Sequence, residues 1–386
     1  MSAIRVVVGG GGGKGMAGFL FGAAGMFAVM YSTQAILPQL GRAFEVGPAE
    51  AGLTVSVVVL ALACGAWAWG PFSDRYGRRR SIVLASTLLV APTIGAALAP
   101  TFSLLLVFRA CQGLCMPGLL TAGVPYVTEV FAPRLGGRAM GYYLTALIAG
   151  GLIGRVGVAL LSAAVGWRWA IGLLAILPLA AAVVMWRSLV DVRPVPVRGG
   201  IGRQLRNRAL LQATVAGSAF FFTFVGTFSY VVFRLERPPF NLGTAAGSFV
   251  FALWFLGVLA PMTGRLADRV GWKRVVFGSL AVAAAGLLLT LPAHLPTLVL
   301  GLALVTLANW CGVTGAQLGV AAASDTDRGA ASSVYYSLYY FTGALGGYLP
   351  GLAWERYGWH GVAAAGWIAI ALAAAVLALG ARRSYG

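Results

Sequence analysis

Charged residues are scarce in this chain, and acidic residues are especially few. Only 10% of its 386 residues are charged, and Asp and Glu together number 10, whereas about a quarter of the residues of a soluble protein are charged. This scarcity excludes an ordinary soluble domain, because most of the surface must face something other than water. The acids all fall between or at the ends of long apolar runs, at Glu45, Glu50, Asp74, Glu129, Asp191, Glu236, Asp268, Asp325, Asp327 and Glu355.

Cysteine and histidine are also few, with 4 and 2 copies. All the cysteines lie inside apolar runs, which argues against a disulfide framework. Cys111 and Cys115 would share a helix face, but no histidine or acid stands near them, so we expect no metal site. The glycine run at 9–13 is followed by Lys14 and Gly15, where a phosphate-binding loop carries Ser or Thr after its lysine. We therefore expect no nucleotide site, no other cofactor and no enzyme activity.

What the chain has in abundance is long apolar runs. Hydrophobic residues make up 59% of it, and its mean hydropathy is +0.85. The runs are about 20 residues long, which is the length that a helix needs to cross ~30 Å of hydrocarbon. We predict twelve membrane-spanning helices, near residues 16–38, 51–71, 81–99, 102–127, 139–162, 168–188, 210–233, 244–263, 275–293, 297–320, 330–353 and 361–381.

The basic residues are distributed unevenly among the loops between these spans. If both termini lie on one side, the loops on that side carry 21 of the 28 Lys and Arg residues and the opposite loops carry 5. The remaining two, Arg109 and Arg155, lie within spans. Because cytoplasmic loops carry the excess of Lys and Arg, we expect a protein of a bacterial-type inner membrane with both termini cytoplasmic. The net charge of +18 then reflects membrane topology and not binding to nucleic acid.

A short basic motif occurs twice, 194 residues apart. GPFSDRYGRRR occupies residues 70–80, and GRLADRVGWKR occupies residues 264–274. The fifth and eleventh spans also share a pair of tyrosines, a Gly-Gly pair and a closing Gly-Trp. We therefore predict an all-α fold of two pseudo-symmetric six-helix bundles around a central cavity, a plan that many transporters follow. The bundles would comprise residues 16–188 and 210–386, with a flexible cytoplasmic tail at 1–15 and a cytoplasmic linker at 189–209.

The repeated motif resembles the loop between the second and third helices of major facilitator superfamily transporters, G-x-L-a-D-r-x-G-r-k-r. The first copy matches at Gly70, Asp74, Arg75, Gly77, Arg78 and Arg79, and the second at Gly264, Asp268, Arg269, Gly271, Lys273 and Arg274. The segment LVFRACQG at 106–113 resembles the fourth-helix motif of the family. The segments YSTQ at 31–34 and GGLIGR at 150–155 are similar to its twelve-helix drug and sugar efflux branch, which includes drug:H+ antiporter-1-like and arabinose-efflux-like members.

This resemblance implies that the first motif copy latches the cytoplasmic side in an outward-open state. Asp74 can accept hydrogen bonds from a helix N-terminus, where the dipole favours an anion. Arg78 follows it by four residues, and Glu129 at the end of the fourth span is a third member. Alternatively, the arginines only fix the topology. The counterpart in the second half would consist of Asp268 with Asp325 or Asp327.

Arg109 and Arg155 are the charges that the spans must carry into the hydrocarbon. A charged residue at the bilayer centre costs about 2.5–3.5 kcal/mol on insertion scales, and no acid lies at the same depth. Each arginine must therefore pair with backbone carbonyls, water or an anionic ligand. The resemblance implies that Arg109, with Gln112 and Gly113, takes part in proton or substrate coupling. For Arg155, a substrate or gating contact and a structural tie both remain open.

By resemblance, the first, fourth, seventh and tenth spans line the transport pathway. The amides among their residues are favoured as ligands, because an uncharged amide buried in a span needs a partner. The glycines of the fifth span, Gly150, Gly151 and Gly154, are expected to let helices pack closely. The candidates for the lining are Tyr31, Gln34, Gln112, Phe221, Phe222, Asn309 and Gln317, with Trp254 and Tyr339 as further aromatic surface.

These features predict a monomeric secondary active transporter that moves a small molecule across the membrane by alternating access. Without a carboxylate at the midplane a cation is poorly matched, so we expect proton-coupled efflux of a neutral or anionic metabolite, sugar or drug. The alternatives are a facilitator or exchanger without proton coupling, and a pump for cationic drugs. Two other classes stay open. One is an intramembrane enzyme, although His294 and His360 lie in loops, and the other is a sensor or scaffold that binds without flux.

Overall fold

The computed structural model describes residues 12–192, 204–323 and 328–382, and the regular elements in these ranges are all helical. In the N-terminal half these are α1 (Gly12–Met30), η1 (Gln34–Ile36), α2 (Leu37–Phe44), α3 (Pro48–Tyr76), α4 (Arg78–Leu98), α5 (Phe102–Cys115), α6 (Pro117–Tyr126), η2 (Val127–Phe131), α7 (Ala132–Leu135), α8 (Arg138–Leu152), η3 (Ile153–Gly157), α9 (Val158–Val165), α10 (Trp167–Leu173) and α11 (Ile176–Ser188). In the C-terminal half they are α13 (Arg208–Glu236), α14 (Thr244–Gly247), η4 (Ser248–Leu259), α15 (Ala260–Val270), α16 (Trp272–Leu289), α17 (Leu295–Ala322) and α18 (Arg328–Arg382). The short elements η1 and η4 are 3₁₀-helical, and η2 and η3 are π-helical.

The number of spans agrees with the prediction of twelve. Ten helices in the described ranges are long and apolar enough to cross a membrane, and α14–η4 with α15 forms an eleventh span that bends by 50°. The element α18 has 55 residues, about twice the length that one crossing needs. Gly358 divides it, because a φ of +56° interrupts the helix at a residue that adopts positive φ without steric cost. The two parts of α18 complete the twelve.

The two copies of the basic motif are helix ends joined by one glycine, whereas the predicted spans left short loops at residues 72–80 and 264–274. In the first copy α3 continues to Tyr76 and α4 begins at Arg78, and in the second copy α15 and α16 flank Gly271 in the same way. The φ angles are +99° at Gly77 and +85° at Gly271, which favour glycine. The motif therefore reverses the chain within a single residue.

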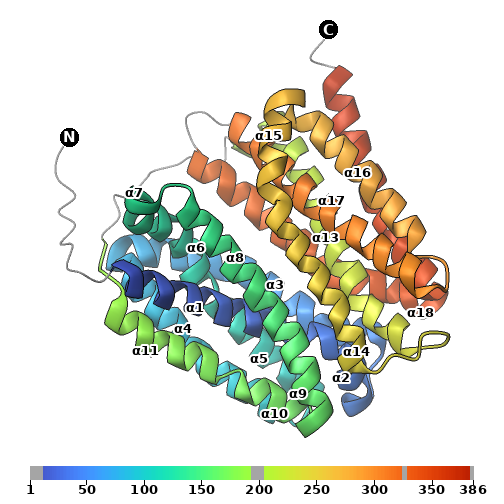
Figure 1. Ribbon diagram of the computed structural model, residues 1–386, viewed down its shortest axis with the longest axis horizontal. Coiled ribbons are helices and arrows are strands. Elements are labelled where there is room, and N and C mark those ends of the chain that lie inside the picture. Colours follow the sequence, from blue (N-terminus) through green and yellow to red (C-terminus); the bar gives the residue numbers. More distant parts are fainter. Residues whose placement is uncertain (1–11, 193–203, 324–327, 383–386) are drawn as a thin grey trace.

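Each half is a bundle whose long helices run between the same two ends of the molecule (Figure 1). We call the end that carries Gly77 and Gly271 the basic end. The opposite end, where Gly166 and Gly358 separate consecutive helices, is the far end. The chain crosses from one end to the other with each span, so the turns alternate between the two ends.

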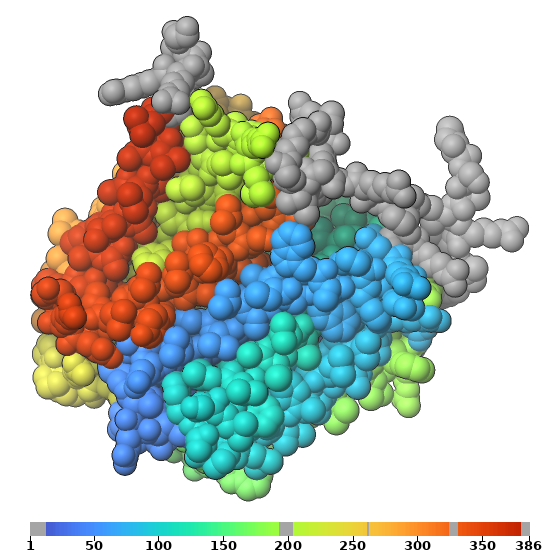
Figure 2. Space-filling view, turned by 180° about the vertical axis from the view of Figure 1, so that it is seen from behind, coloured from blue at the N-terminus to red at the C-terminus, as the bar shows by residue number. Residues whose placement is uncertain are grey.

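The halves meet along α3 and the first part of α18, which lie side by side in Figure 2. The closest approach is between glycines. Gly52 of α3 lies against the Gly347 carbonyl, and a Cβ on Gly351 would lie 2.6 Å from the Ala49 Cα. In addition, the Ala49 amide donates to Glu355 Oε1 at 3.1 Å. These contacts belong to the start of α3, so they hold the halves together at the far end.

The first span is a single crossing, Gly13–Phe44, as the sequence predicted, but its middle is irregular, which the sequence did not predict. It was expected as one helix over residues 16–38, but α1 ends at Met30 and the chain turns through residues 31–33 before η1 and α2. The predicted tail at 1–15 overlaps α1 from Gly12 onward, and its residues 1–11 lie outside the described ranges. The predicted linker at 189–209 ends as α13 begins at Arg208, and residues 193–203 of it are also outside those ranges.

Candidate functional site

Arg109 of α5 contacts the irregular turn in the middle of the first span. Its side chain is 1% exposed. Its guanidinium donates to the Val29 carbonyl at 3.0 Å and the Met30 carbonyl at 2.6 Å, both at the end of α1, and to the Thr54 carbonyl of α3 at 2.9 Å. The last carbonyls of a helix lack partners within it, and a cation is stabilised there by the helix dipole. Arg109 thus adds donors to the end of α1, where the Val29 carbonyl also accepts from the Ser32 amide and hydroxyl.

Gln112 and Gly113 belong to the same network. Gln112 accepts a hydrogen bond from Arg109 at 2.7 Å and donates to Thr93 of α4 at 3.1 Å. Gly113 lies directly against the Val58 carbonyl of α3, so a side chain would not fit there. Of the partners left open for Arg109, the structure therefore shows backbone carbonyls. The arrangement joins α5 to α1, α3 and α4, next to the turn that carries Tyr31 and Gln34.

Arg155 has a different environment. It lies in the π-helical turn η3 of the fifth span and is 0% exposed. Its Nε donates to Gln34 Oε1 at 2.7 Å, and its Nη1 donates to the Gly151 carbonyl at 2.7 Å. The guanidinium carbon lies 3.8 Å from the ring centre of Tyr31 and 3.5 Å from that of Trp254. Single π-helical turns often occur at functional positions in helices.

This cluster crosses between the two halves. Trp254 belongs to η4 of the C-terminal half, whereas Arg155 and Tyr31 belong to the N-terminal half. Gln34 extends the link, because its Nε2 donates to Ser229 Oγ of α13 at 3.0 Å. A continuous series of polar and cation–π contacts therefore runs from the fifth span through the first span to the seventh and eighth spans.

Two N–H donors in the cluster have no hydrogen-bond partner among the described residues. They are Arg155 Nη2 and Trp254 Nε1, and both atoms are buried. Leaving a buried donor unpaired costs about 1–3 kcal/mol, and more when it is charged. Unpaired groups of this kind in a native structure point to a ligand or water that satisfies them. The described part of the cluster therefore offers no acceptor for these two donors.

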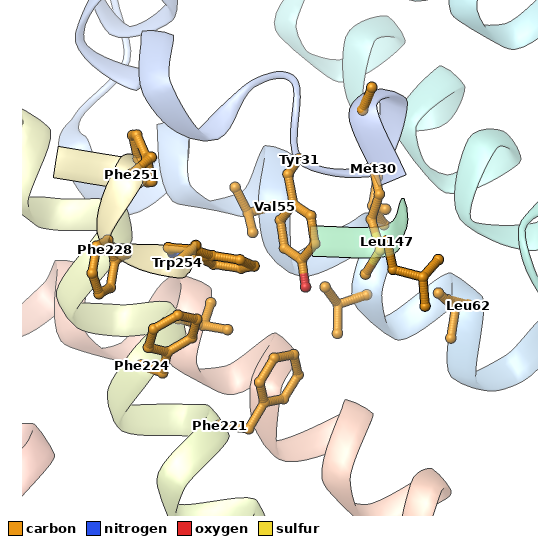
Figure 3. Packing of buried hydrophobic residues seen from close by; sticks show 14 of the residues in the cluster. Met30, Tyr31, Val55, Leu62, Leu147, Phe221, Phe224, Phe228, Phe251 and Trp254 are labelled. Carbon is orange, nitrogen blue, oxygen red and sulfur yellow. The ribbon is translucent and has the colours of Figure 1, made fainter. Parts of the chain in front are cut away.

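An aromatic wall continues from the cluster along the C-terminal half (Figure 3). Trp254 contacts Phe224 and Phe228, with ring centres 4.6 and 6.3 Å apart. One turn away on α13, Phe221 stacks on Tyr339 of α18 at 4.2 Å and 8°. Figure 3 shows Tyr31 facing Trp254 across the interface, with its hydroxyl pointing toward the side where Phe221 lies. The wall is apolar in its body and carries phenol groups at its edge.

The glycines of the fifth span bring α8 close to α1. A Cβ on Gly150 would lie 2.5 Å from the Ala24 Cα, and one on Gly154 would lie 2.5 Å from the Ala28 Cα. Gly151 instead faces Arg155, whose Nη1 would be 2.9 Å from a Cβ there. Close packing of this kind places η3 against the end of α1, next to Tyr31.

The basic end carries an ion pair within the N-terminal half. Arg78 donates to both carboxylate oxygens of Glu129 at 2.7 Å, from its Nε and Nη2, which is the strong bidentate geometry. Asp74 lies 3.9 Å from Arg78 Nη1. The three residues that we grouped from the motif are therefore neighbours. Asp74 is half-exposed, and the described hydrogen bonds include none to it from a helix N-terminus, contrary to our expectation.

A residue that sequence reasoning did not select joins this cluster. Asp191 follows α11, and its Oδ1 would lie 2.7 Å from a Cβ on Gly77. The next residue, Val192, accepts a hydrogen bond from the Arg78 amide at 3.2 Å. Arg79 donates to the Trp186 carbonyl of α11 and lies over the Trp186 ring. The end of the sixth span is therefore tied to the motif, whereas Gly70 and Arg75 lie at its periphery.

The second motif copy is not organised in the same way. Asp268 and Arg269 are exposed, and Asp268 forms no ion pair with any residue in the described ranges. Its expected partners, Asp325 and Asp327, lie outside those ranges. Gly264, Lys273 and Arg274 border the reversal at Gly271.

Asn309 and Gln317 both lie on α17, apart from the Arg155 cluster in the hydrogen-bond pattern. Gln317 donates to the Tyr336 hydroxyl at 3.3 Å, and the two residues border a cavity of about 220 Å³ at the basic end. Asn309 is buried, and its Oδ1 has no hydrogen-bond partner within the described ranges. The described hydrogen bonds connect neither amide to Arg155.

Sequence reasoning selected Tyr31, Gln34 and Arg155 separately, and the structure brings them together. It named Trp254 only as aromatic surface and missed Ser229 and Phe251, whose ring centre lies 5.2 Å from the Arg155 guanidinium carbon. These partners come from the other half of the chain. Only one signal in the sequence could have pointed to these partners, namely that Arg155 lies within a span that has no acid at the same depth.

Comparison with known proteins identifies the relatives of this chain. The family model described as Major Facilitator Superfamily matches residues 19–259 and 238–385. The chain is 31% identical over 359 residues to the uncharacterized MFS-type transporter YybF of Bacillus subtilis (strain 168), covering 89% of this chain and 88% of the relative. It is 29% identical over 360 residues to the inner membrane transport protein YnfM of Escherichia coli (strain K12), covering 91% and 86%.

Solved structures share the fold. A bacterial homologue of the human lysosomal transporter Spinster, in an inward-facing and unoccupied conformation, superposes with a TM-score of 0.78 at 15% identity, over 97% of this chain and 98% of that one. The human organic anion transporter MFSD10 (TETRAN) gives a TM-score of 0.70 at 17% identity, over 95% and 98%. The described helices thus form the same architecture as these chains.

Proposed function

Because this chain belongs to the Major Facilitator Superfamily, whose members are multi-pass membrane transporters and not enzymes, we propose that it is a secondary active transporter that works by alternating access. The two halves rock against each other about the Arg155 cluster, as the repeats of such transporters do about a site near the midplane. The inner membrane is the proposed location, with the basic end and both termini in the cytoplasm. The 21-to-5 distribution of basic residues supports this orientation.

The observation that carries the proposal is the asymmetry of the interface between the halves. The side-chain hydrogen bonds between described residues of the two halves run from Gln34–Ser229 in the middle to the far end. There Gln39 donates to Thr244 at 3.1 Å, and Arg42 pairs with Glu236 at 2.7 Å. The ion pair at the basic end, by contrast, stays within one half. This conformation is therefore closed at the far end, and a rocking motion would exchange these contacts for contacts at the basic end.

The proposed substrate is neutral or anionic, and the proposed direction is efflux coupled to protons. The middle of the bundle carries Arg109 and Arg155, and the described ion pairs that involve acids lie at its ends. A cationic substrate would meet like charge at the Arg155 cluster without a compensating carboxylate. Because Arg109 is occupied by backbone carbonyls, Asp74 and Glu129 at the basic end are the proposed proton carriers.

A pH-dye assay on everted membrane vesicles tests this function. Respiration sets up the proton gradient, and neutral, anionic and cationic compounds are then added in turn. Release of the gradient by a neutral or anionic compound, lost in Arg155→Gln and kept in the control Arg168→Gln, is the expected result. Counterflow of a labelled solute without any effect on the gradient would favour a facilitator or exchanger. Release by cations alone would contradict the proposed substrate charge.

A further inference from the structure

We infer that the Arg155 cluster is the binding site for an organic monoanion with a planar, apolar body. The inference rests on the proposed transport function and names the substrate class that it leaves open between neutral and anionic. Four features of the cluster lead to it, namely its unpaired donors, its uncompensated charge, its aromatic wall and its place between the halves.

The unpaired atoms in the cluster are donors of the same kind. Arg155 Nη2 and Trp254 Nε1 are buried N–H groups without partners, and the guanidinium lies against the indole ring at 3.5 Å. Neither arginine nor tryptophan can accept a hydrogen bond in return. A group that only accepts, such as a carboxylate or sulfonate, satisfies both, whereas an ammonium group or another donor satisfies neither. The unpaired donors therefore select a ligand group that accepts hydrogen bonds, such as a carboxylate or a neutral carbonyl, and the charge of Arg155 decides between the two.

The charge in the cluster amounts to one unit. Arg155 is its single cation, its partners are the neutral Gln34 side chain and the Gly151 carbonyl, and no described acid pairs with it. A charge buried in this way is normally neutralised by a partner of opposite sign. One negative charge on the ligand would neutralise it. A zwitterion such as an amino acid would bring an ammonium group for which the cluster offers no carboxylate.

The surroundings of the cluster favour a flat apolar body next to the anionic group. Trp254, Phe224 and Phe228 form a continuous aromatic surface, and Phe221 stacked on Tyr339 extends it toward the basic end. Rings bind rings in offset or edge-to-face arrangements, so an aromatic body is held better than an aliphatic one.

The site is covered in the present conformation, and its construction explains how it opens. Tyr31 covers one face of the guanidinium from its own half, and Trp254 covers it from the other half. When the halves separate, Trp254 leaves with the C-terminal half and the guanidinium becomes accessible. The anion then binds Arg155, and Trp254 brings its N–H to the bound anion as the halves close again, so binding and the motion of the halves are linked.

Equilibrium binding to the purified full chain in detergent tests the inference. The probes are benzoate, its neutral amide benzamide, the cation benzylammonium, and acetate, titrated by calorimetry or by ligand-induced thermal shift. Benzoate is expected to bind at least about tenfold more tightly than benzamide and acetate, and benzylammonium is expected not to bind. Equal affinity for benzoate and benzamide, or no saturable binding of benzoate, would overturn the inference.

Variants assign the binding to the cluster. Arg155→Gln is expected to remove the preference of benzoate over benzamide, and Trp254→Phe, which keeps a ring but deletes the N–H, to weaken benzoate binding several-fold. Arg168→Gln is the matched control, because Arg168 also donates to backbone carbonyls in the same half but lies at the far end. If Arg155→Gln does not fold, Arg155→Lys and Trp254→Phe still carry the test. Unchanged benzoate binding in the folded variants would overturn the assignment.

Binding and transport can fail separately. Benzoate binding without flux in proteoliposomes would contradict the proposed transport function and leave the anion site intact. Flux of a neutral solute by a protein that does not bind benzoate would support transport and overturn the inferred substrate class.

Discussion

The guanidinium of Arg155 lies 3.5 Å from the ring centre of Trp254, across the interface between the two halves of the chain. A buried charge of one half thus rests on an aromatic ring of the other. Cation–π contacts of this kind strengthen when both groups are removed from water. Any rocking of the halves must change the distance between this guanidinium and this ring, so the surroundings of the Arg155 charge depend on the conformation.

Replacing Arg109 should disturb the Arg155 cluster, although Arg109 is not part of that cluster. Lysine keeps the charge but is a compact point charge that cannot replace the planar guanidinium fork, so in Arg109→Lys some of the three carbonyls lose their donor, at about 1–3 kcal/mol each. We expect a lower melting temperature and reduced flux, measured by thermal denaturation in detergent and by counterflow. Arg168→Lys, which loses carbonyl contacts at the half-exposed far end, should have a smaller effect. A wild-type melting temperature in Arg109→Lys would contradict this structural role.

Two glycines of η3 should respond differently to the same small change. Gly154→Ala places a methyl group against the Ala28 backbone and should force α8 away from α1, whereas Gly157→Ala meets only a distant Ile153 methyl group at 3.9 Å. We expect Gly154→Ala to lose most of its transport activity and Gly157→Ala to keep it. Counterflow at equal expression levels measures the difference. Equal activity of the two variants would argue against close packing as the reason for glycine at 154.

The ion pair at the basic end should show coupling in a double-mutant cycle. Glu129→Gln removes the negative charge and one of the two oxygens that accept from Arg78, and charge-assisted hydrogen bonds of this kind contribute about 1.5–3 kcal/mol. We expect Arg78→Gln, Glu129→Gln and the double variant to be destabilised by similar amounts, because each loses the same interaction. Arg80→Gln, at an exposed position of the same helix, should be neutral. If the destabilisation of the double variant equals the sum of the two single destabilisations, the pair contributes nothing to the free energy of unfolding.

Closure of the far end depends on glycine at position 351. A methyl group there would meet the Ala49 Cα at 2.6 Å and also crowd Tyr230, so Gly351→Ala should keep α3 and α18 apart. We expect a large loss of flux with little loss of expression. Gly243→Ala, also at the far end but with no atom within 4 Å of the added carbon, serves as the control and should transport normally. Normal flux in Gly351→Ala would show that this contact is not needed for transport.

The fold could be predicted from the sequence because the membrane leaves few alternatives. Apolar runs of about 20 residues must be helices, and the alternation of basic loops fixes their number. The Arg78–Glu129 pair was also accessible, because the motif and the position of Glu129 at the end of a span place them at the same end. The Gly358 boundary was accessible from the Gly-Trp that closes the eleventh span.

The irregular turn in the first span could not be predicted, and the reason is physical. Residues 31–33 contain neither glycine nor proline, so no local preference marks the end of α1. Additional donors to the carbonyls there come from Arg109, which is 80 residues away from Val29 in the chain. Likewise, the contact of Arg155 with Trp254 depends on how two bundles are rotated against each other. Residue types within one span do not contain that information.

The most direct test of alternating access measures distances at both ends of the same molecule. Spin labels are placed on exposed residues of the two halves, with Ala43→Cys and Ala246→Cys at the far end and Arg80→Cys and Arg269→Cys at the basic end. The native cysteines, Cys64, Cys111, Cys115 and Cys311, are replaced first. Pulsed electron resonance in liposomes, with and without benzoate and at different pH values, then gives both distance distributions.

The account predicts that the two distances change in opposite directions. Conditions that lengthen the far-end distance should shorten the basic-end distance, and Gly351→Ala should show the long far-end distance throughout. Distributions that stay fixed under all conditions, or that lengthen together at both ends, would contradict a rocking motion of the halves about Arg155.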